Sequence, residues 1–84
     1  MTMEILVSSL AAILTTAAFV PQALHIIRHK ETRAISLQMY VVFAAGVAFW
    51  LLFGFMIWNC PMIIANTITL ALALTILRMK LKYG

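Results

Sequence analysis

The chain has 84 residues, of which 65% are hydrophobic and 10% are charged. Soluble domains carry about 25% charged residues, and a chain this short cannot bury so much apolar side chain in water. The composition argues against a soluble enzyme, a DNA-binding module or a disordered tail, and it indicates a small integral membrane protein. The net charge of +4 comes from bases beside apolar runs. It is therefore a topology signal rather than a nucleic-acid surface.

Two stretches without charged residues predict three membrane-spanning helices. The first, Ile5 to Ile27, would reach about 34 Å as a helix, enough to cross a hydrocarbon core of about 30 Å. The second, Ala34 to Leu77, is about twice as long, so the chain must turn within it. The best break is at Pro61, because proline suits the first turn of a helix. The expected spans are 5–27, 36–58 and 61–79, within a single domain covering 1–84, and Ser36 is the expected N-cap of the second span.

The charges predict the orientation of the chain in the membrane. Glu4 but no Lys or Arg precedes the first span, which favours a retained span over a cleaved signal peptide. All six Lys and Arg residues lie in the loop after the first span and in the C-terminal tail. Three spans place these two segments on one side, which the positive-inside rule makes cytoplasmic. The N-terminus is then expected outside and the C-terminus inside.

The first span carries small and polar residues that fit either close helix packing or the lining of a cavity: Ser8, Ala11, Ala12, Thr15 and Thr16. Pro21 lies in the cytoplasmic half of this span, where it removes a backbone hydrogen bond. Pro21 and the adjacent Gln22 form either a static kink or a hinge.

The second and third spans carry the remaining candidate residues. One face of the second span predicts a packing seam or a path lining, with residues at alternating steps of four and three: Met39, Phe43, Gly46, Trp50, Phe53 and Ile57. Trp50 lies about 12 Å inside the outer end, deeper than the interface that tryptophan prefers. Asn66 lies at a similar depth, where an amide is costly unless it pairs with another helix or with a ligand. Thr69 follows on the same face.

Several kinds of chemistry are missing from the sequence. The sequence holds no Asp, Glu, Lys or Arg from Ile5 to Ile27 or from Ala34 to Leu77, which argues against proton coupling through a buried carboxylate. No nucleophile–base pair, metal-ligand cluster or glycine-rich phosphate loop is present, so no enzyme activity, cofactor or metal is expected. Three helices cannot enclose a solute path, so a transporter of this size would need a second copy, most simply in a two-fold dimer.

The motifs resemble those of one family in order and spacing: Thr15-Thr16-Ala17-Ala18-Phe19-Val20-Pro21-Gln22, Thr32-Arg33-Ala34-Ile35-Ser36, Met39-Tyr40, Gly46, Trp50-Leu51-Leu52-Phe53-Gly54 and Ile64-Ala65-Asn66-Thr67-Ile68-Thr69-Leu70. The first segment resembles the proline–glutamine motif of the PQ-loop proteins. Together they are similar to the SemiSWEETs, the bacterial half-size relatives of SWEET sugar transporters, over nearly the whole chain.

The resemblance implies an all-α bundle of three membrane helices, packed in the order 1-3-2, in a parallel homodimer. It implies a uniporter in the lipid bilayer of the bacterial inner membrane that moves mono- or disaccharides down their gradient by alternating access. The sugar-contacting tryptophan and asparagine of the family fall on Trp50 and Asn66, and its hinge falls on Pro21 and Gln22. We add Thr16 and Thr69 as candidate substrate-binding residues.

The gates are expected from the same resemblance. Several relatives close the outer mouth with a latch of Tyr, Arg and Asp, and the matching positions here are Phe53, Ile57 and Asn59. We therefore predict a hydrophobic outer plug of Phe53 and Ile57 in place of an ionic latch. The inner gate candidates are Phe19, Met39 and Phe43.

Two alternatives to a sugar transporter remain open. One is a carrier of another small polar solute, and the other is a non-transporting assembly subunit in which the polar residues only hold helices together. A proton-coupled drug exporter fits poorly, because the sequence lacks a fourth span and a buried glutamate.

Overall fold

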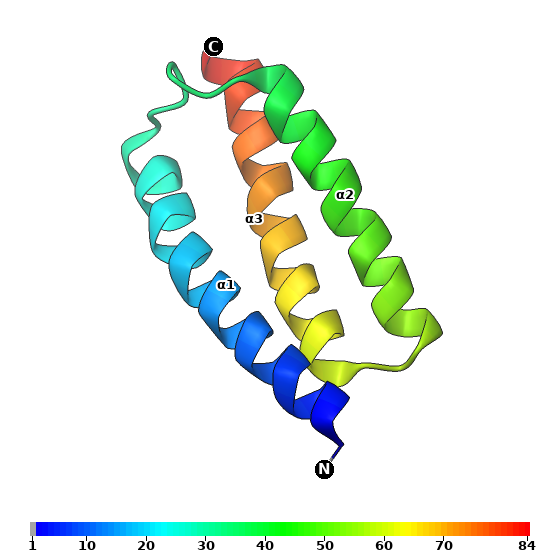
Figure 1. Cartoon of the computed structure of the whole chain (residues 1–84). Coiled ribbons are helices and arrows are strands. Elements are labelled where there is room, and N and C mark those ends of the chain that lie inside the picture. The colour runs from blue at the N-terminus through cyan, green and yellow to red at the C-terminus, as the bar shows by residue number, and fades with distance from the viewer. Residues whose placement is uncertain (1) are drawn as a thin grey trace.

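The computed structural model describes residues 2–84 as three α-helices joined by two short loops (Figure 1). Helix α1 spans Met3–His29, α2 spans Leu37–Met56 and α3 spans Cys60–Tyr83. By length and composition, each helix can cross a membrane. The longest dimension of the molecule is 45 Å, close to the full thickness of a bilayer with its headgroups. The chain is an all-α, multi-pass membrane protein.

Polar residues begin all three helices. The side chains of Thr2, Ser36 and Asn59 each accept a backbone N–H from the first turn that follows, which satisfies a donor that would otherwise lack a partner. This confirms Ser36 as the N-cap of α2. Helix α1 extends beyond the expected span at both ends and α3 beyond its C-terminal end, because helical hydrogen bonding continues past the apolar core into the charged segments.

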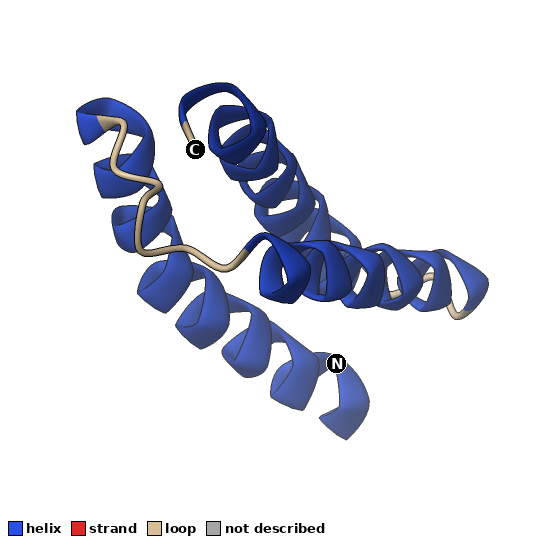
Figure 2. Ribbon diagram, turned by 90° about the horizontal axis from the view of Figure 1, so that it is seen from above, coloured by secondary structure: helices blue, strands red, loops and turns tan. Residues whose placement is uncertain are grey.

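Helix α3 lies between α1 and α2 and packs on both, so the order across the bundle is 1-3-2, as expected (Figures 1 and 2). Small residues make this close packing possible, and Ala23, Ala44, Ala65 and Ala73 are all buried. Helix α2 packs tightly on α3 at Gly54, where an added Cβ would lie 3.3 Å from side-chain atoms of Ile63 and Met62.

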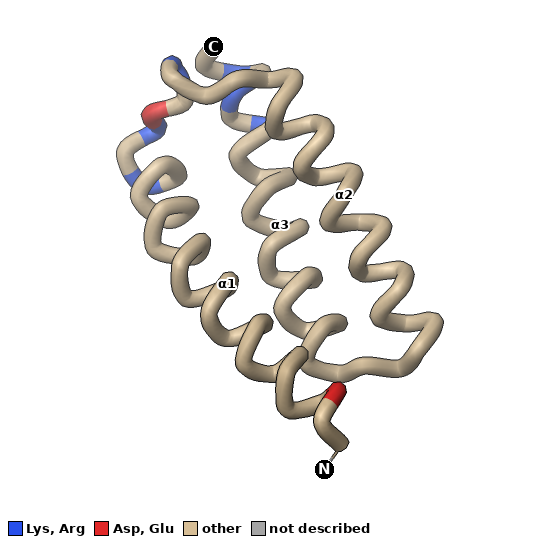
Figure 3. Tube along the Cα trace, in the orientation of Figure 1, with Lys and Arg blue, Asp and Glu red and all other residues tan. Residues whose placement is uncertain are grey.

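The two ends of the bundle differ in charge. Every Lys and Arg gathers at the end formed by the α1–α2 loop and the C-terminus, as Figure 3 shows. We call this end, residues 28–36 and 78–84, the basic end. The opposite end, residues 2–8 and 57–62, carries Glu4 and no Lys or Arg. The charge asymmetry inferred from the sequence is therefore also an asymmetry of the folded molecule.

Candidate functional site

A groove of about 540 Å³ lies among the three helices, and we call it the central groove. Its volume falls in the range of about 300–1,000 Å³ that is usual for small-molecule sites. Its aromatic lining is Phe19, Phe43 and Trp50, and its polar lining is Ser8, Thr15, Asn66 and Thr69. Within the described residues, the backbones of α1 and α2 lie close to α3 and not to each other, so no backbone covers the groove opposite α3 in a single protomer.

Trp50 presents an open aromatic surface beside the central groove. Its side chain is 57% exposed, and its ring meets Phe53 edge-on with centroids 6.0 Å apart. The indole of tryptophan offers both an apolar face and an N–H donor. Trp50 therefore has a fixed neighbour on one side and free ring surface for a ligand.

Asn66 brings an amide from α3 to the same groove. Its Nδ2 donates to the Met62 carbonyl oxygen one turn earlier, at 2.8 Å. This bond uses one of the two N–H groups, so a second N–H and the amide oxygen are left for a ligand. Trp50 and Asn66, expected at similar depth, thus line one groove from two different helices. Thr69 lines it as well.

Thr16 lies elsewhere. It lines a second groove of about 840 Å³ between α1 and α3, together with Ser9, Pro21 and Cys60. Consecutive helical residues point about 100° apart, and here Thr15 lines the central groove while Thr16 lines the second one. Thr15 faces it and donates its hydroxyl to the Ala11 carbonyl oxygen at 2.8 Å. The Thr16 hydroxyl oxygen is buried, with no hydrogen-bond partner among the described residues.

The candidate inner-gate residues separate into two places. Phe19 of α1 and Phe43 of α2 meet with ring centroids 5.6 Å apart, and Tyr40 lies 5.9 Å from Phe43. These rings join α1 to α2 across the groove. Met39 instead is 64% exposed and lines a shallow groove at the start of α2. Of the hinge residues, Pro21 lies inside an unbroken α1, and Gln22 is exposed.

The candidate outer-gate residues also differ in environment. Phe53 and Ile57 are exposed in the protomer, at 43% and 51%. Asn59 is buried and makes two kinds of contact. Its Oδ1 accepts the Met62 N–H at 3.2 Å, which caps α3, and its Nδ2 donates to the Ser8 Oγ at 3.0 Å.

Two ties between distant segments were not predicted from the sequence. One is the Ser8–Asn59 bond at the opposite end. The other is at the basic end, where Lys80 Nζ donates to the Thr32 carbonyl oxygen at 3.0 Å and contacts that of Arg33 at 3.5 Å. Asn59, two residues before Pro61, is a sequence signal for the N-cap of α3. Nothing in the spacing pointed to Ser8 as the partner of Asn59.

The fold and the central groove together define a class of protein. The chain is a small multi-pass membrane protein whose helices hold an aromatic and polar, uncharged site at membrane depth. Within residues 2–84, no group of three or more His, Cys, Asp or Glu residues could hold a metal ion. The groove therefore offers ring stacking and hydrogen bonds as its means of recognition.

Comparison with known proteins places the chain in a family. Residues 4–60 match the PQ loop repeat. The sugar transporter SemiSWEET of Leptospira biflexa serovar Patoc is 43% identical, covering 98% of this chain and 96% of its own. That of Bradyrhizobium diazoefficiens is 40% identical over 94% and 92%. The chain therefore belongs to the SemiSWEET family of PQ-loop proteins.

Solved structures agree with this assignment. A crystal structure of SemiSWEET in the inward-open conformation matches with a TM-score of 0.89 and 38% identity, covering 98% of this chain and 95% of that one. A crystal structure of a bacterial homologue of SWEET transporters matches with a TM-score of 0.80. The relatives are named as transporters, a function without enzymatic chemistry, which fits the expectation that the chain is not an enzyme.

Proposed function

We propose that this protein is a sugar transporter that moves mono- or disaccharides down their gradient by alternating access. The observation that carries the proposal is the meeting of Trp50 and Asn66 in one groove of about 540 Å³. The names of the relatives support sugar as the substrate class. Both residues suit a sugar, because its C–H edges stack on an aromatic face and its hydroxyls both donate and accept hydrogen bonds.

The working unit in this proposal is a parallel homodimer in the lipid bilayer. The central groove is uncovered on one side. Trp50, which lines it, and Phe53 and Ile57, which follow on the same helix, are all exposed in the single protomer. A second copy related by a two-fold axis along the membrane normal would cover this surface and enclose the path. Two copies of Trp50 would then face the sugar from both sides, and two Asn66 amides would hold its hydroxyls.

Orientation and location follow from the charge distribution. The basic end is assigned to the cytoplasm, which places the N-terminus outside and the C-terminus inside the bacterial inner membrane. Tyr83 at the basic end and Trp58 at the opposite end are both exposed, as suits rings that anchor at the two interfaces.

Movement is assigned to the part of α1 nearer the basic end. Pro21 has no N–H to donate and so weakens the helix there, and with Gln22 it forms the proposed hinge. The Phe19–Phe43 contact is the central part of the inner gate, with Met39 further toward the basic end.

The outer gate is assigned to the end of α2 and the loop that follows. Phe53 and Ile57 of both copies form its plug, and Asn59 holds the adjacent helix ends. Among the candidate substrate residues, Thr69 lies in the groove. Thr16 lines the second groove instead, outside the proposed sugar site.

The proposal is tested by labelled-sugar counterflow in proteoliposomes, with glucose and with sucrose, without a pH gradient. We expect counterflow by the parent protein. Trp50→Ala and Asn66→Ala should each lower it by at least about tenfold, which corresponds to losing about 1.4 kcal/mol of binding energy. Phe49→Ala is the matched control, because Phe49 is a 72% exposed aromatic residue next to Trp50 outside the central groove.

The outcomes separate the proposed function from its alternatives. Full counterflow by both Trp50→Ala and Asn66→Ala would show that these two residues do not form the sugar site. Absence of counterflow for both sugars, from parent protein shown to be folded and dimeric, would favour another polar solute or the assembly subunit. A sugar-dependent change in Trp50 fluorescence would then distinguish binding from a pure packing role.

A further inference from the structure

We infer that Asn59 is a positioning residue that fastens the outer part of α1 to α3, so that only the part of α1 beyond Pro21 moves during transport. This inference rests on the proposed function and goes beyond it. It gives Asn59 a task within one protomer, between its own helices, in place of a contact between the two copies.

The carrying observation is a partly buried network at the opposite end of the molecule. Asn59 is 6% exposed. Its Nδ2 donates to Ser8 Oγ at 3.0 Å, and the Ser8 hydroxyl also lies 3.2 Å from the Ile5 carbonyl oxygen. Ser8 and Asn59 are 51 positions apart in the chain, so this bond connects the first helix to the third directly.

Asn59 is held firmly enough to act as an anchor. Its Oδ1 caps α3 through the Met62 N–H at 3.2 Å, and its own backbone N–H donates to the Gly54 carbonyl oxygen at 2.9 Å. One residue therefore holds the end of α2, the start of α3 and, through Ser8, the outer part of α1. A side chain fixed by three elements is well placed to hold α1 in register.

The position of the link determines which part of α1 can move. Ser8 lines the central groove at the opposite end, whereas Pro21 lies further along α1 toward the basic end. With the link formed, α1 cannot swing as one rigid rod. The swing is confined to the turns after the proline, and the seam between α1 and α3 stays closed at the outer end.

Ser8→Ala is the decisive variant, because it removes the link and leaves the cap of α3 in place. Ser9→Ala is its matched control, since the neighbouring serine faces the second groove. Asn59→Asp should keep the link, because a carboxylate can accept both the Met62 N–H and the Ser8 hydroxyl and suits a helix N-terminus.

Cys60 reports the seam without any sugar. It is the only cysteine in the chain, it is exposed, and it lines the second groove between α1 and α3 together with Ser9. The rate at which a maleimide modifies Cys60 should rise in Ser8→Ala, because loss of the link lets α1 move away from the groove that Cys60 lines. Ser9→Ala should keep the parent rate.

Counterflow kinetics supply the second readout. Ser8→Ala should lower the maximal rate and leave the half-saturating sugar concentration unchanged, because Trp50 and Asn66 are untouched. A parent-like Cys60 rate in Ser8→Ala would overturn the inference, and so would a raised half-saturating concentration at an unchanged Cys60 rate, since Ser8 would then be a sugar contact. If the parent shows no counterflow, the proposed function fails, and the Cys60 rates still decide whether the link exists.

Discussion

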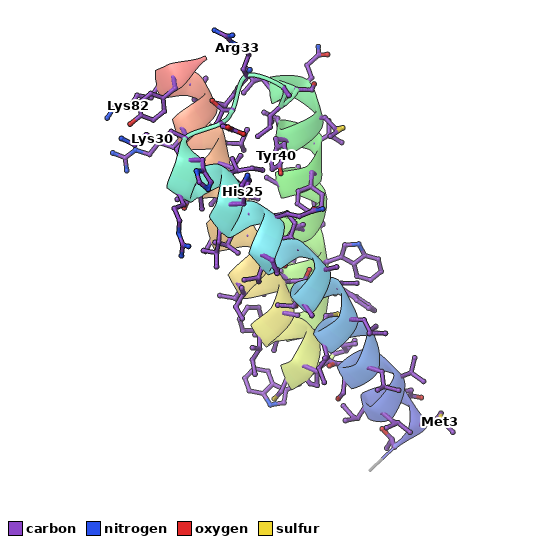
Figure 4. The ribbon with its side chains drawn as sticks, turned by 90° about the vertical axis from the view of Figure 1, so that its left-hand side faces the viewer. Met3, His25, Lys30, Arg33, Tyr40 and Lys82 are labelled. Atoms are coloured by element: carbon purple, nitrogen blue, oxygen red, sulfur yellow. The ribbon has the colours of Figure 1, made fainter. Side chains whose placement is uncertain are left out.

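The two ends of the bundle hold their helices together by different means. At the opposite end the tie between α1 and α3 is neutral, between the side chains of Ser8 and Asn59, and buried at the asparagine. At the basic end a charged group from α3, Lys80 Nζ, reaches the backbone carbonyl oxygens of Thr32 and Arg33. Nearby, Lys30 and Lys82 place their ammonium groups 5.6 and 5.4 Å from the Tyr83 ring centroid. Figure 4 shows Lys30, Lys82 and Arg33 gathered at this end, far from Met3.

This difference suits a carrier that moves at one end. A bond between two neutral side chains is little affected by salt, whereas contacts of charged groups are screened over about 8–10 Å at physiological ionic strength. The basic end also contains an unsatisfied buried polar group, because Thr32 is 1% exposed and its hydroxyl has no hydrogen-bond partner among the described residues. The contacts at the basic end are weakened by salt, and one buried hydroxyl there lacks a partner. A different arrangement of the helices could therefore add hydrogen bonds at the basic end.

The largest effect is expected from overfilling the contact between α2 and α3 beside the opposite end. Gly54→Val should destabilise the protein by about 1–3 kcal/mol, the usual range for overpacking. The first added carbon already lies 3.3 Å from Ile63 and Met62 side-chain atoms. Thermal unfolding in detergent measures this, and Gly54→Ala should show a smaller loss. A parent-like melting temperature for the valine variant would show that α2 and α3 can separate here at little cost.

At the basic end, removing the Lys80 tie should have a moderate effect. Lys80→Met leaves the two loop carbonyl oxygens without this donor and should cost about 1–2 kcal/mol, in the range for one hydrogen bond to a charged group. Trypsin should cut after Arg33 several-fold faster, since the loop opens more often.

Lys82→Met is the control for that variant, because the Lys82 ammonium contacts only an exposed ring among the interactions found. The effect of Lys80→Met should shrink in about 1 M salt, where the screening length is about 3 Å. The effect of Ser8→Ala at the opposite end should not shrink in high salt. Equal salt responses at the two ends would remove the contrast between them.

The sequence was informative about the fold because the membrane leaves few choices. Apolar runs of sufficient length must be helices in lipid, and one proline after a polar residue located the second turn. The side chains were harder. The stripe through Trp50 could be predicted from the spacing of its residues. Which of Thr15 and Thr16 lines the central groove depends on how α1 is rotated against α3, and packing of small residues determines that rotation.

The hydrogen bonds between distant segments could not be predicted from the sequence, for a different reason. Ser8 meets Asn59, and Lys80 meets the loop at Thr32, only because α3 lies between the other two helices. The position of α3 came from family resemblance rather than from residue patterning. A neutral serine and a terminal lysine carry no signal of their own at the sequence level.

The smallest expected effect compares the two residues held in the left-handed backbone region, Lys30 at φ 54° near the basic end and Trp58 at φ 52° near the opposite end. Glycine adopts this conformation without the penalty of about 1–2 kcal/mol that other residues pay. Lys30→Gly gives up only the contact with the Tyr83 ring and should raise stability by about 0.5–1 kcal/mol. Trp58→Gly gains the same relief and loses an interfacial ring that packs 6.3 Å from Phe55, so its net change should be close to zero. Unfolding of both variants in lipid bicelles measures the difference, with Lys30→Ala as the control that loses the ring contact and keeps the strain. If Trp58→Gly gained more than Lys30→Gly, the tryptophan would contribute nothing as an anchor, and the opposite end would be the more strained of the two.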